Sequence, residues 1–552
     1  MGTWTINPDD LAATRTGLGL GTAAAANTGT SNGNVPVVGS DGKLPGAILD
    51  IPASGGSISL TASGAIAAGK AVILNANGTV TEGSGTVVSA AIGSSYTPAN
   101  ETATDVGESA YMTVPNKFIQ LNRSTISGSN LIRAAVLDVA QDLAITETVA
   151  PTAVTGVSGG TPYSITYSET RDRAVAHYQG ESPYPPNFNT FSYSAGAGLK
   201  FDGLTNHNSG NLPYGSTVFV GADDNTLAGT YAGSPSTIKR RLWTLTTGSD
   251  ASADSTSSSG GEQAMTFTDP GASYTYYQTA VWFPVQSQLA FITHYYLGAT
   301  DYRVALAYGA MSGSGGSATW SESGEIAWSD TDLYCYQGNF PYHADTDRAY
   351  WFDSADFRTV SMNGGAKKSA IQVINATDPV ASSVTVPIPG SNLVVVFAGN
   401  QASSSALSYW VINVTAGTNA EGDSFSVTGP VQIASDATYH GISAAYSPDT
   451  DSFLVRQRLQ SGASKSYGIR IARTTTNISS TNFLGFAASA VGDGAAITVQ
   501  LPGATATPTG GSLVVGTTYY IQKTGLVGTA NASLGIAGRA ISSTQLIVEA
   551  RS

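Results

Sequence analysis

The sequence predicts an all-β protein, and three observations lead to this prediction. Charged residues make up only 11% of the 552 residues, whereas Gly alone contributes 63. Turn-forming and β-tolerant residues (Gly, Ser, Thr, Ala, Tyr) dominate over the strong helix formers. A unit of about 55 residues also recurs through the middle of the chain, a period typical of four-stranded propeller blades. We therefore predict a six-bladed β-propeller flanked by small β modules and an extended amino-terminal segment.

The repeated unit consists of an aromatic strand, a polar turn and an apolar strand. The aromatic starts of the strong copies are Tyr167, Tyr342 and Tyr446. Each copy carries an Asp five positions later: Asp172, Asp347 and Asp451. Weaker copies begin at Phe219, Trp282 and Val386. Since a catalytic group is needed once but a turn device is needed in every blade, we expect these Asp side chains to cap backbone N–H groups in blade turns. Calcium ligation is the alternative.

Four segments follow from the repeat and from changes in composition. They are an extended segment at 1–55, a small β module at 56–116, the propeller at 117–480 and a second small β module at 481–552. The two modules are expected to be related, because Gly64–Val80 and Gly511–Val527 match without a gap in three glycines and in their apolar positions. Both stretches have the pattern of a glycine turn, a short strand and a second turn.

The first 55 residues contain few large apolar side chains. Alone, such a segment cannot bury enough apolar surface to offset its chain entropy. It is therefore either disordered or ordered by packing on copies of itself or on a larger assembly.

Charge and cysteine content exclude several classes of partner. The net charge of −13 repels phosphate backbones and argues against nucleic acid. The basic clusters 239–241 and 367–368 are expected to be solvated. Cys335 is the single cysteine, so neither an intrachain disulfide nor a cysteine-based metal site is expected. With no signal-peptide pattern at Met1–Thr5 and no long apolar run, we expect synthesis in the cytoplasm and no membrane insertion.

Both ends of the chain carry motifs rich in glycine and alanine. Residues 18–30 (LGLGTAAAANTGT) through Gly42-Lys43-Leu44-Pro45 resemble virion-proximal segments of tail-fibre and appendage proteins. Residues 483–487, 491–499, 516–521 and 535–543 are similar to small β modules of phage structural proteins. The resemblance implies a virion protein attached by its amino-terminal segment, often as a homotrimer, with other tail proteins as partners. Contacts with neighbouring chains would then order the first 55 residues.

No motif in the chain indicates catalysis, and neither a cofactor nor a metal is expected. The five histidines have no metal-ligand spacing, and neither HExxH nor GxSxG occurs. Among enzymes, a glycosidase is the class to test, with Glu322 and Glu325 as the carboxylate pair. The surrounding string, 321–328, departs from the S-x-D-x-G-x-x-W turn of sialidase-type propellers, so solvated side chains are the expected interpretation.

Aromatic residues in predicted loops are candidates for glycan contact. Aromatic rings stack on the C–H faces of sugars, and a phenol adds a polar group. The candidates are Tyr184, Tyr274, Tyr276, Tyr277, Tyr334 and Tyr336. For any one tyrosine, packing between sheets is the competing role.

These observations favour a virion appendage that anchors by its amino terminus and presents a propeller to a host glycan or protein. A purely structural tail-hub, collar or head-fibre component is the first alternative. A glycan-degrading tailspike is the second.

Overall fold

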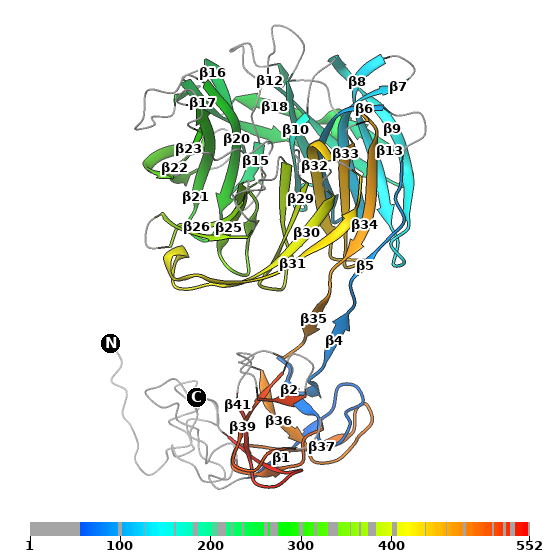
Figure 1. Ribbon diagram of the computed structural model, residues 1–552, viewed down its shortest axis with the longest axis vertical. Coiled ribbons are helices and arrows are strands. Elements are labelled where there is room, and N and C mark those ends of the chain that lie inside the picture. Colours follow the sequence, from blue (N-terminus) through cyan, green and yellow to red (C-terminus); the bar gives the residue numbers. More distant parts are fainter. Residues whose placement is uncertain are drawn as a thin grey trace, which may run out of the picture. The chain divides into compact units, whose positions relative to one another are not determined.

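The computed structural model describes residues 56–549 apart from internal segments (Figure 1). The predicted amino-terminal segment, 1–55, and residues 550–552 lie outside the described part. The internal segments not described are 98–101, 127–128, 159–161, 180–185, 202–204, 207–216, 222–223, 225, 235–236, 259–262, 265–273, 297–301, 314–316, 329–339, 354, 364–365, 374–381, 400–405, 437, 460, 479–481, 510–512, 523–525 and 530–535.

The chain divides into two compact units. The first combines Met1–Ser89 with Ala472–Ser552, and the second is Ala90–Ile471. Strands dominate both units, and the short helical turns include η3 (Ala251–Ala253) and η5 (Ala420–Gly422). The prediction of an all-β protein is confirmed.

Seven antiparallel sheets follow one another within the second unit. The first three are β6–β9 (Thr102–Met112, Lys117–Ile126, Ser129–Val139, Ile145–Ser158), β10–β14 (Pro162–Ser168, Arg173–Gln179, Pro186–Ser194, Gly198–Phe201, Thr205–Asn206) and β15–β19 (Thr217–Val220, Thr226–Ser234, Thr237–Thr246, Ser255–Ser258, Gln263–Ala264). The next three are β20–β23 (Tyr274–Phe283, Gln288–Tyr296, Tyr302–Ser312, Thr319–Trp328), β24–β27 (Tyr342–His343, Arg348–Asp353, Asp356–Ser361, Lys367–Gln372) and β28–β31 (Ser382–Pro387, Leu393–Gly399, Leu407–Thr415, Ser424–Ala434). The seventh combines β32–β34 (Thr438–Ser447, Ser452–Leu459, Ser464–Arg470) with β5 (Ala91–Ile92).

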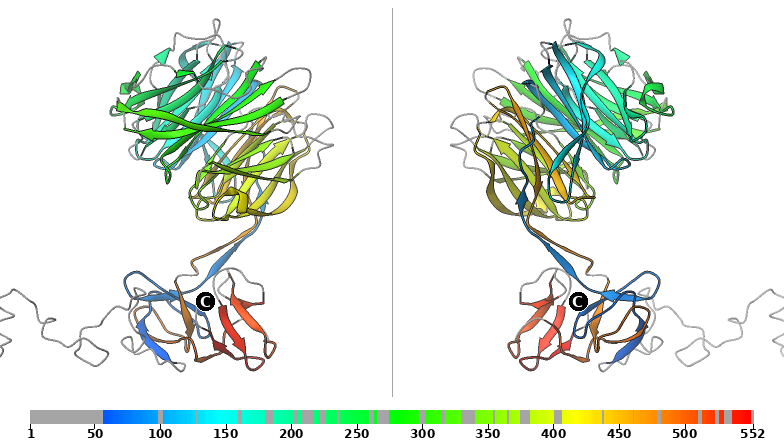
Figure 2. Two further views of the ribbon diagram at one scale, coloured as in Figure 1. Left: turned by 90° about the vertical axis from the view of Figure 1, so that its left-hand side faces the viewer. Right: turned by 90° about the vertical axis from the view of Figure 1, so that its right-hand side faces the viewer.

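The seven sheets form a closed ring. Each pair of neighbouring sheets shares a hydrophobic cluster, and such a cluster also joins the seventh sheet to the first. At that junction Leu143 of the first sheet packs with Leu454 of the seventh. The first strands of neighbouring sheets contact each other at six junctions, and at the junction of the fifth and sixth sheets β28 contacts β25. The first strands are therefore the innermost ones. Figure 2 shows the succession of sheets from cyan through green to orange. This unit is a β-propeller, as predicted.

A strand from the beginning of the unit completes its last blade. β5 pairs with β34, placing Ile92 opposite Ile469, and Tyr96 exchanges two 2.8 Å backbone hydrogen bonds with Ser466. Gly468 is required at this junction, because a Cβ atom there would lie 2.5 Å from the carbonyl oxygen of Leu143. The ring is therefore closed by antiparallel pairing between its two chain ends.

The predicted count of six blades is wrong, because one copy of the repeat was not recognised. All six predicted starts lie in first strands of blades, at β10, β15, β20, β24, β28 and β32. The remaining blade begins with β6, where Tyr111 is followed five positions later by Asn116 instead of Asp. Asn116 has the same left-handed backbone (φ 53°) as Asp172 (φ 49°). Asn and Asp both adopt this conformation readily, so the turn is kept although the sequence signal is lost.

The first unit contains two five-stranded sheets with identical strand order. The first module is made of β1 (Ser57–Thr61), β2 (Ala71–Leu74), β3 (Val80–Glu82), β36 (Phe483–Ala487) and β37 (Ala496–Gln500). The second module is made of β38 (Thr505–Ala506), β39 (Thr518–Ile521), β40 (Val527–Gly528), β41 (Ile536–Ala540) and β42 (Leu546–Val548). Numbered within each module, both sheets have the order 1-5-4-2-3.

Details of backbone geometry support a duplication. In both modules the second and fourth strands pair with a β-bulge, next to Gly485 in one and Gly538 in the other. A Cβ atom on either glycine would lie 2.0 Å from a carbonyl oxygen of the fifth strand. β2 and β39 also occupy equivalent positions in the predicted match between Gly64–Val80 and Gly511–Val527.

The propeller is inserted into the first module. The third and fourth strands of the second module are joined by residues 529–535, whereas those of the first module are joined by residues 83–482. Figure 1 shows the resulting mixture of blue and orange strands in one sheet. The chain leaves and returns through a two-stranded ladder, β4 (Gly85–Val88) with β35 (Arg473–Thr476).

The domain boundaries therefore differ from the predicted ones. The propeller begins at Ala90 instead of residue 117 and ends at Ile471 instead of residue 480. The segment 56–116 is not a separate module, since β6 belongs to the first blade and β1–β3 pair with strands beyond the propeller. Sequence patterns describe neighbours along the chain, so they could not show this pairing across the insertion.

Candidate functional site

The hairpins between the first and second strands of the seven blades share one conformational feature. Each contains a residue with positive φ: Asn116, Asp172, Asp224, Ser287, Asp347, Gly390 and Asp451. This conformation costs other L-residues roughly 1–2 kcal/mol. We call the propeller face formed by these hairpins, together with those between third and fourth strands, the turn face.

Four of these turns are closed by a side-chain pair. The Tyr167 hydroxyl donates to Asp172 Oδ1 at 2.8 Å, and Tyr342 and Tyr446 donate to Asp347 and Asp451 at 2.9 Å. Tyr111 donates to Asn116 Oδ1 over a longer distance, 3.4 Å. Burial, and then the hydrogen bond to Asp172, raise the pKa of Tyr167 above its usual range. The Tyr167 phenol therefore stays protonated and remains a donor.

Arginines connect neighbouring blades on the turn face. Arg173, the first residue of β11, donates from Nε to Asp254 Oδ2 (2.8 Å) and from Nη2 to the carbonyl of Gly248 (3.0 Å), both in the next blade. Arg348, the first residue of β25, repeats this arrangement with Asp423 and Gly417. Arg348 is 2% exposed and Asp423 is fully buried.

Asp423 is the centre of a hydrogen-bonded network. It follows helix η5 and accepts from the backbone N–H of Gly417 (2.9 Å) and from the Thr359 hydroxyl (3.1 Å) besides Arg348. Asp254 holds the equivalent place after η3 and accepts from the N–H of Gly248 (2.8 Å). A buried ion pair of this kind is tolerated only when its remaining lone pairs are also satisfied.

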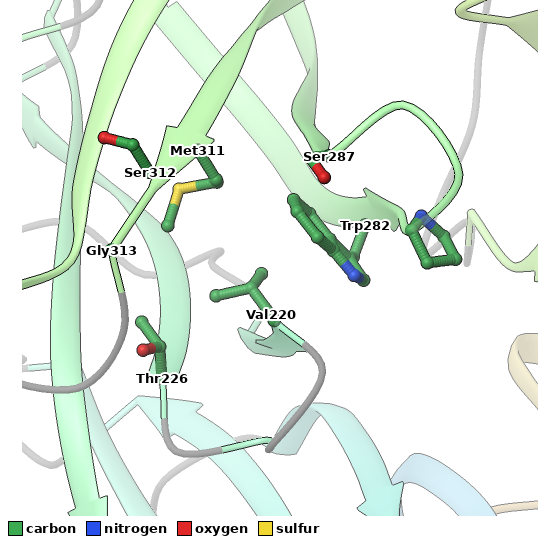
Figure 3. Close-up of a pocket in the computed structure, with 9 residues that line it drawn as sticks. Val220, Thr226, Trp282, Ser287, Met311, Ser312 and Gly313 are labelled. Carbon is green, nitrogen blue, oxygen red and sulfur yellow. The ribbon is translucent and has the colours of Figure 1, made fainter. Parts of the chain in front are cut away.

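The junction between the third and fourth blades has no arginine at this position and contains a pocket. Thr226, the first residue of β16, stands where Arg173 and Arg348 stand in their blades, and Gly313 follows β22 in the hairpin that faces it. The pocket has a volume of about 220 Å³ and is lined by Trp282, Met311, Val220, Thr226, Ser287 and Ser312 among others. Figure 3 shows Trp282 and Met311 on facing sides of the space, with Val220 between them.

Local hydrogen bonds hold the wall of the pocket. The N–H of Ser287 donates to the carbonyl of Pro284 (3.4 Å), and the N–H of Met311 donates to the carbonyl of Ser287 (3.0 Å). The hydroxyls of Ser312 and Thr319 are 2.7 Å apart. Trp282 is half-buried, so one part of its side chain packs in the blade while another part lines the pocket.

The described residues do not test the tyrosines predicted to contact glycan. Tyr184, Tyr334 and Tyr336 lie outside them. Tyr274, Tyr276 and Tyr277 begin strand β20, and their side chains are not described. The pocket therefore consists of residues that the sequence did not single out as binding residues. Trp282 was noticed only as the start of a weak repeat copy.

The predicted carboxylate pair lies on an outer strand. Glu322 and Glu325 belong to β23, the outermost strand of the fourth blade, opposite Gly309 and Ala307. Arg240 of the third blade stacks on Trp320 at 3.7 Å. Arg240 is buried, so the expectation that the basic cluster 239–241 is solvated is wrong for this residue. Burial lowers the pKa of Arg240 to about 10, which leaves it charged at neutral pH.

The described part of the chain shows neither a cluster of metal ligands nor a membrane-spanning helix. There, no three His, Cys, Asp or Glu side chains gather in a way that would hold a metal ion. Buried His343 instead lies 2.9 Å from the Thr346 hydroxyl and 3.1 Å from the carbonyl of Ile388. Across the same residues, no helix is long and apolar enough to cross a membrane.

Comparisons with known proteins identify similar folds and no family. No family model and no curated protein match the chain. Similar solved structures include a periplasmic gluconolactonase of Pseudomonas aeruginosa, 11% identical over 69% of this chain and 97% of the other, with a TM-score of 0.40. An α-L-arabinanase of Penicillium chrysogenum is 10% identical over 70% and 98%, with a TM-score of 0.35. A protein of Lactobacillus plantarum is 11% identical over 63% and 96%, with a TM-score of 0.38. At these values no function is transferred to this chain.

Proposed function

We propose that this chain is a bacteriophage virion protein, a tail fibre or related appendage, whose propeller contacts the host surface. The observation that carries the proposal is the insertion of a complete propeller into the connection between two strands of a duplicated small β module. An inserted domain with its own closed ring can change its surface without changing the unit that carries it. This is the arrangement expected of a recognition domain presented by a structural one.

The ends of the chain supply the second line of support. Residues 18–45 resemble virion-proximal segments of phage appendages, and the strands of both modules include the stretches that resemble phage β modules. Assembly as a homotrimer would place several propellers on one particle. Weak binding by each propeller would then be multiplied by effective concentration.

Location on the particle is the direct test of the virion assignment. An antiserum raised against the purified chain is expected to label intact particles from the lysate of producing cells at discrete tail or appendage positions. Mass spectrometry of the same purified particles should recover peptides from both units. Finding the chain only in the soluble lysate, with unlabelled particles, would overturn the assignment.

A further inference from the structure

We infer that the pocket between the third and fourth blades binds one pyranose ring of a neutral glycan. The inference rests on the proposed function for its biological role, but the ligand class follows from the pocket itself. The pocket opens on the turn face, at a junction that has neither the Tyr–Asp turn pair nor the arginine–carboxylate ion pair found elsewhere in the ring.

The first feature missing at this junction is the hydrogen-bonded turn pair. Tyr pairs with Asp or Asn in the first, second, fifth and seventh blades. The equivalent positions of the fourth blade hold Trp282 and Ser287. Trp282 and Ser287 do not form the hydrogen-bonded turn pair of those blades. The turn keeps its left-handed residue (φ 51° at Ser287), and both residues line the pocket.

The second missing feature is the ion pair that connects two neighbouring blades. At the junctions of blades two and three and of blades five and six, a guanidinium fills the gap and binds a buried carboxylate. At this junction Thr226 stands in place of the arginine, and Gly313 of the opposing hairpin lines the pocket. Of the seven described second strands, two begin with arginine, so the ion pair is not a feature of every junction. At this junction its absence goes together with a pocket that is lined by an aromatic ring.

The lining defines the chemistry of the ligand. Trp282 offers an aromatic ring, and Met311 and Val220 add apolar surface. Ser287 and Ser312 add polar residues to the lining, and none of the described lining residues is charged. A pyranose has the matching features, since an apolar C–H face stacks on an indole while its hydroxyls exchange hydrogen bonds.

The volume of the pocket and the net charge of the chain narrow the choice of ligand further. A volume of about 220 Å³ lies below the roughly 300–1,000 Å³ of pockets for drug-sized ligands, so it suits a single ring. The net charge of −13 disfavours anionic sugars at long range. We therefore expect uncharged hexoses or N-acetylhexosamines to bind, with a Kd on the order of 1–10 mM for the free monosaccharide.

Saturation-transfer NMR on the full chain tests the inference. The probes are glucose, galactose, mannose and N-acetylglucosamine, each compared with glucuronic acid. At least one neutral sugar is expected to receive saturation, and Trp282→Ala is expected to weaken its binding about tenfold. The double variant Trp282→Tyr/Ser287→Asp rebuilds the turn pair of the other blades, so it should abolish binding while the thermal transition is kept. Val285→Ala is the control, because Val285 is 71% exposed in the same turn and does not line the pocket.

The outcomes separate this inference from the proposed function. The inference is overturned if no neutral sugar binds the wild-type chain, or if the double variant binds as well as the wild type. It is also overturned if glucuronic acid binds more tightly than every neutral sugar. If the antiserum labels virions but the pocket binds no sugar, the proposed function is kept and the pocket assignment is rejected. If the chain binds a sugar but is absent from particles, the pocket assignment is kept and the proposed function is rejected.

Discussion

Replacing Asp423 by Asn is expected to lower the free energy of unfolding of the propeller by about 3–5 kcal/mol. The substitution keeps the shape of the side chain but leaves the Arg348 guanidinium, which is 2% exposed, without its counter-charge. The same carboxylate also accepts hydrogen bonds from the Gly417 N–H and the Thr359 hydroxyl. The substitution therefore also weakens the contacts that hold the hairpin around η5. Urea unfolding followed by tryptophan fluorescence measures the effect, since the propeller contains Trp243, Trp282, Trp320, Trp328, Trp351 and Trp410.

A matched control lies two residues away. Glu421 pairs with Lys367 at 3.2 Å, but the two side chains are 59% and 36% exposed. Because solvent screens such a pair, Glu421→Gln should change the free energy of unfolding by about 0–1 kcal/mol. Equal unfolding midpoints for the two variants would contradict the view that the buried ion pair joins the fifth and sixth blades.

Each unit is expected to fold without the other. Val88 and Arg473 are directly opposed in the ladder of β4 with β35, so a two-residue Asn-Gly turn can replace Ser89–Ala472 and close a hairpin. The shortened chain should give a cooperative unfolding transition and a β-type circular dichroism spectrum. The separate fragment Ala90–Ile471 should also fold, because it carries β5 and can close its own ring.

The fragment that begins at Thr97 provides the contrast. It lacks β5 and Tyr96, which leaves the edge of β34 unpaired in the last blade. An exposed edge of this kind promotes association between chains. We expect lower stability and aggregation from this fragment alone. An insertion would be the wrong description if the chain lacking Ser89–Ala472 failed to fold.

Much of the propeller was predictable because its turns demand particular residues. A left-handed residue at the same place in successive hairpins restricts the choice to Asp, Asn, Gly or a tolerated Ser, and this produced the visible period. Asn116 meets the same demand with a different residue, so a search for Asp missed the first blade. The two-residue strand β5 carries no period of its own. Its role depends on pairing with a strand that lies hundreds of residues later.

The candidate site was less predictable than the fold. Tyrosines clustered in the sequence were the predicted contacts, whereas the pocket depends on Trp282 and Ser287, which are single departures from a repeat. Their signal was present, because Trp replaces Tyr and Ser replaces Asp in one aligned copy. Thr226 and Met311 lie near these two residues because two blades pack together, and the sequence does not show this packing. Sequence periods describe what the blades share, whereas the site depends on the particular residues that two neighbouring blades bring together.

An adsorption-competition assay tests the central claim that the propeller is the recognition domain. Host cells are incubated with the purified full chain before particles are added, and the rate of particle adsorption is measured. The full chain is predicted to slow adsorption in proportion to its concentration, whereas the chain with Ser89–Ala472 replaced by Asn-Gly has no effect. Equal inhibition by the two chains, or none by the full chain, would contradict the assignment of host recognition to the propeller.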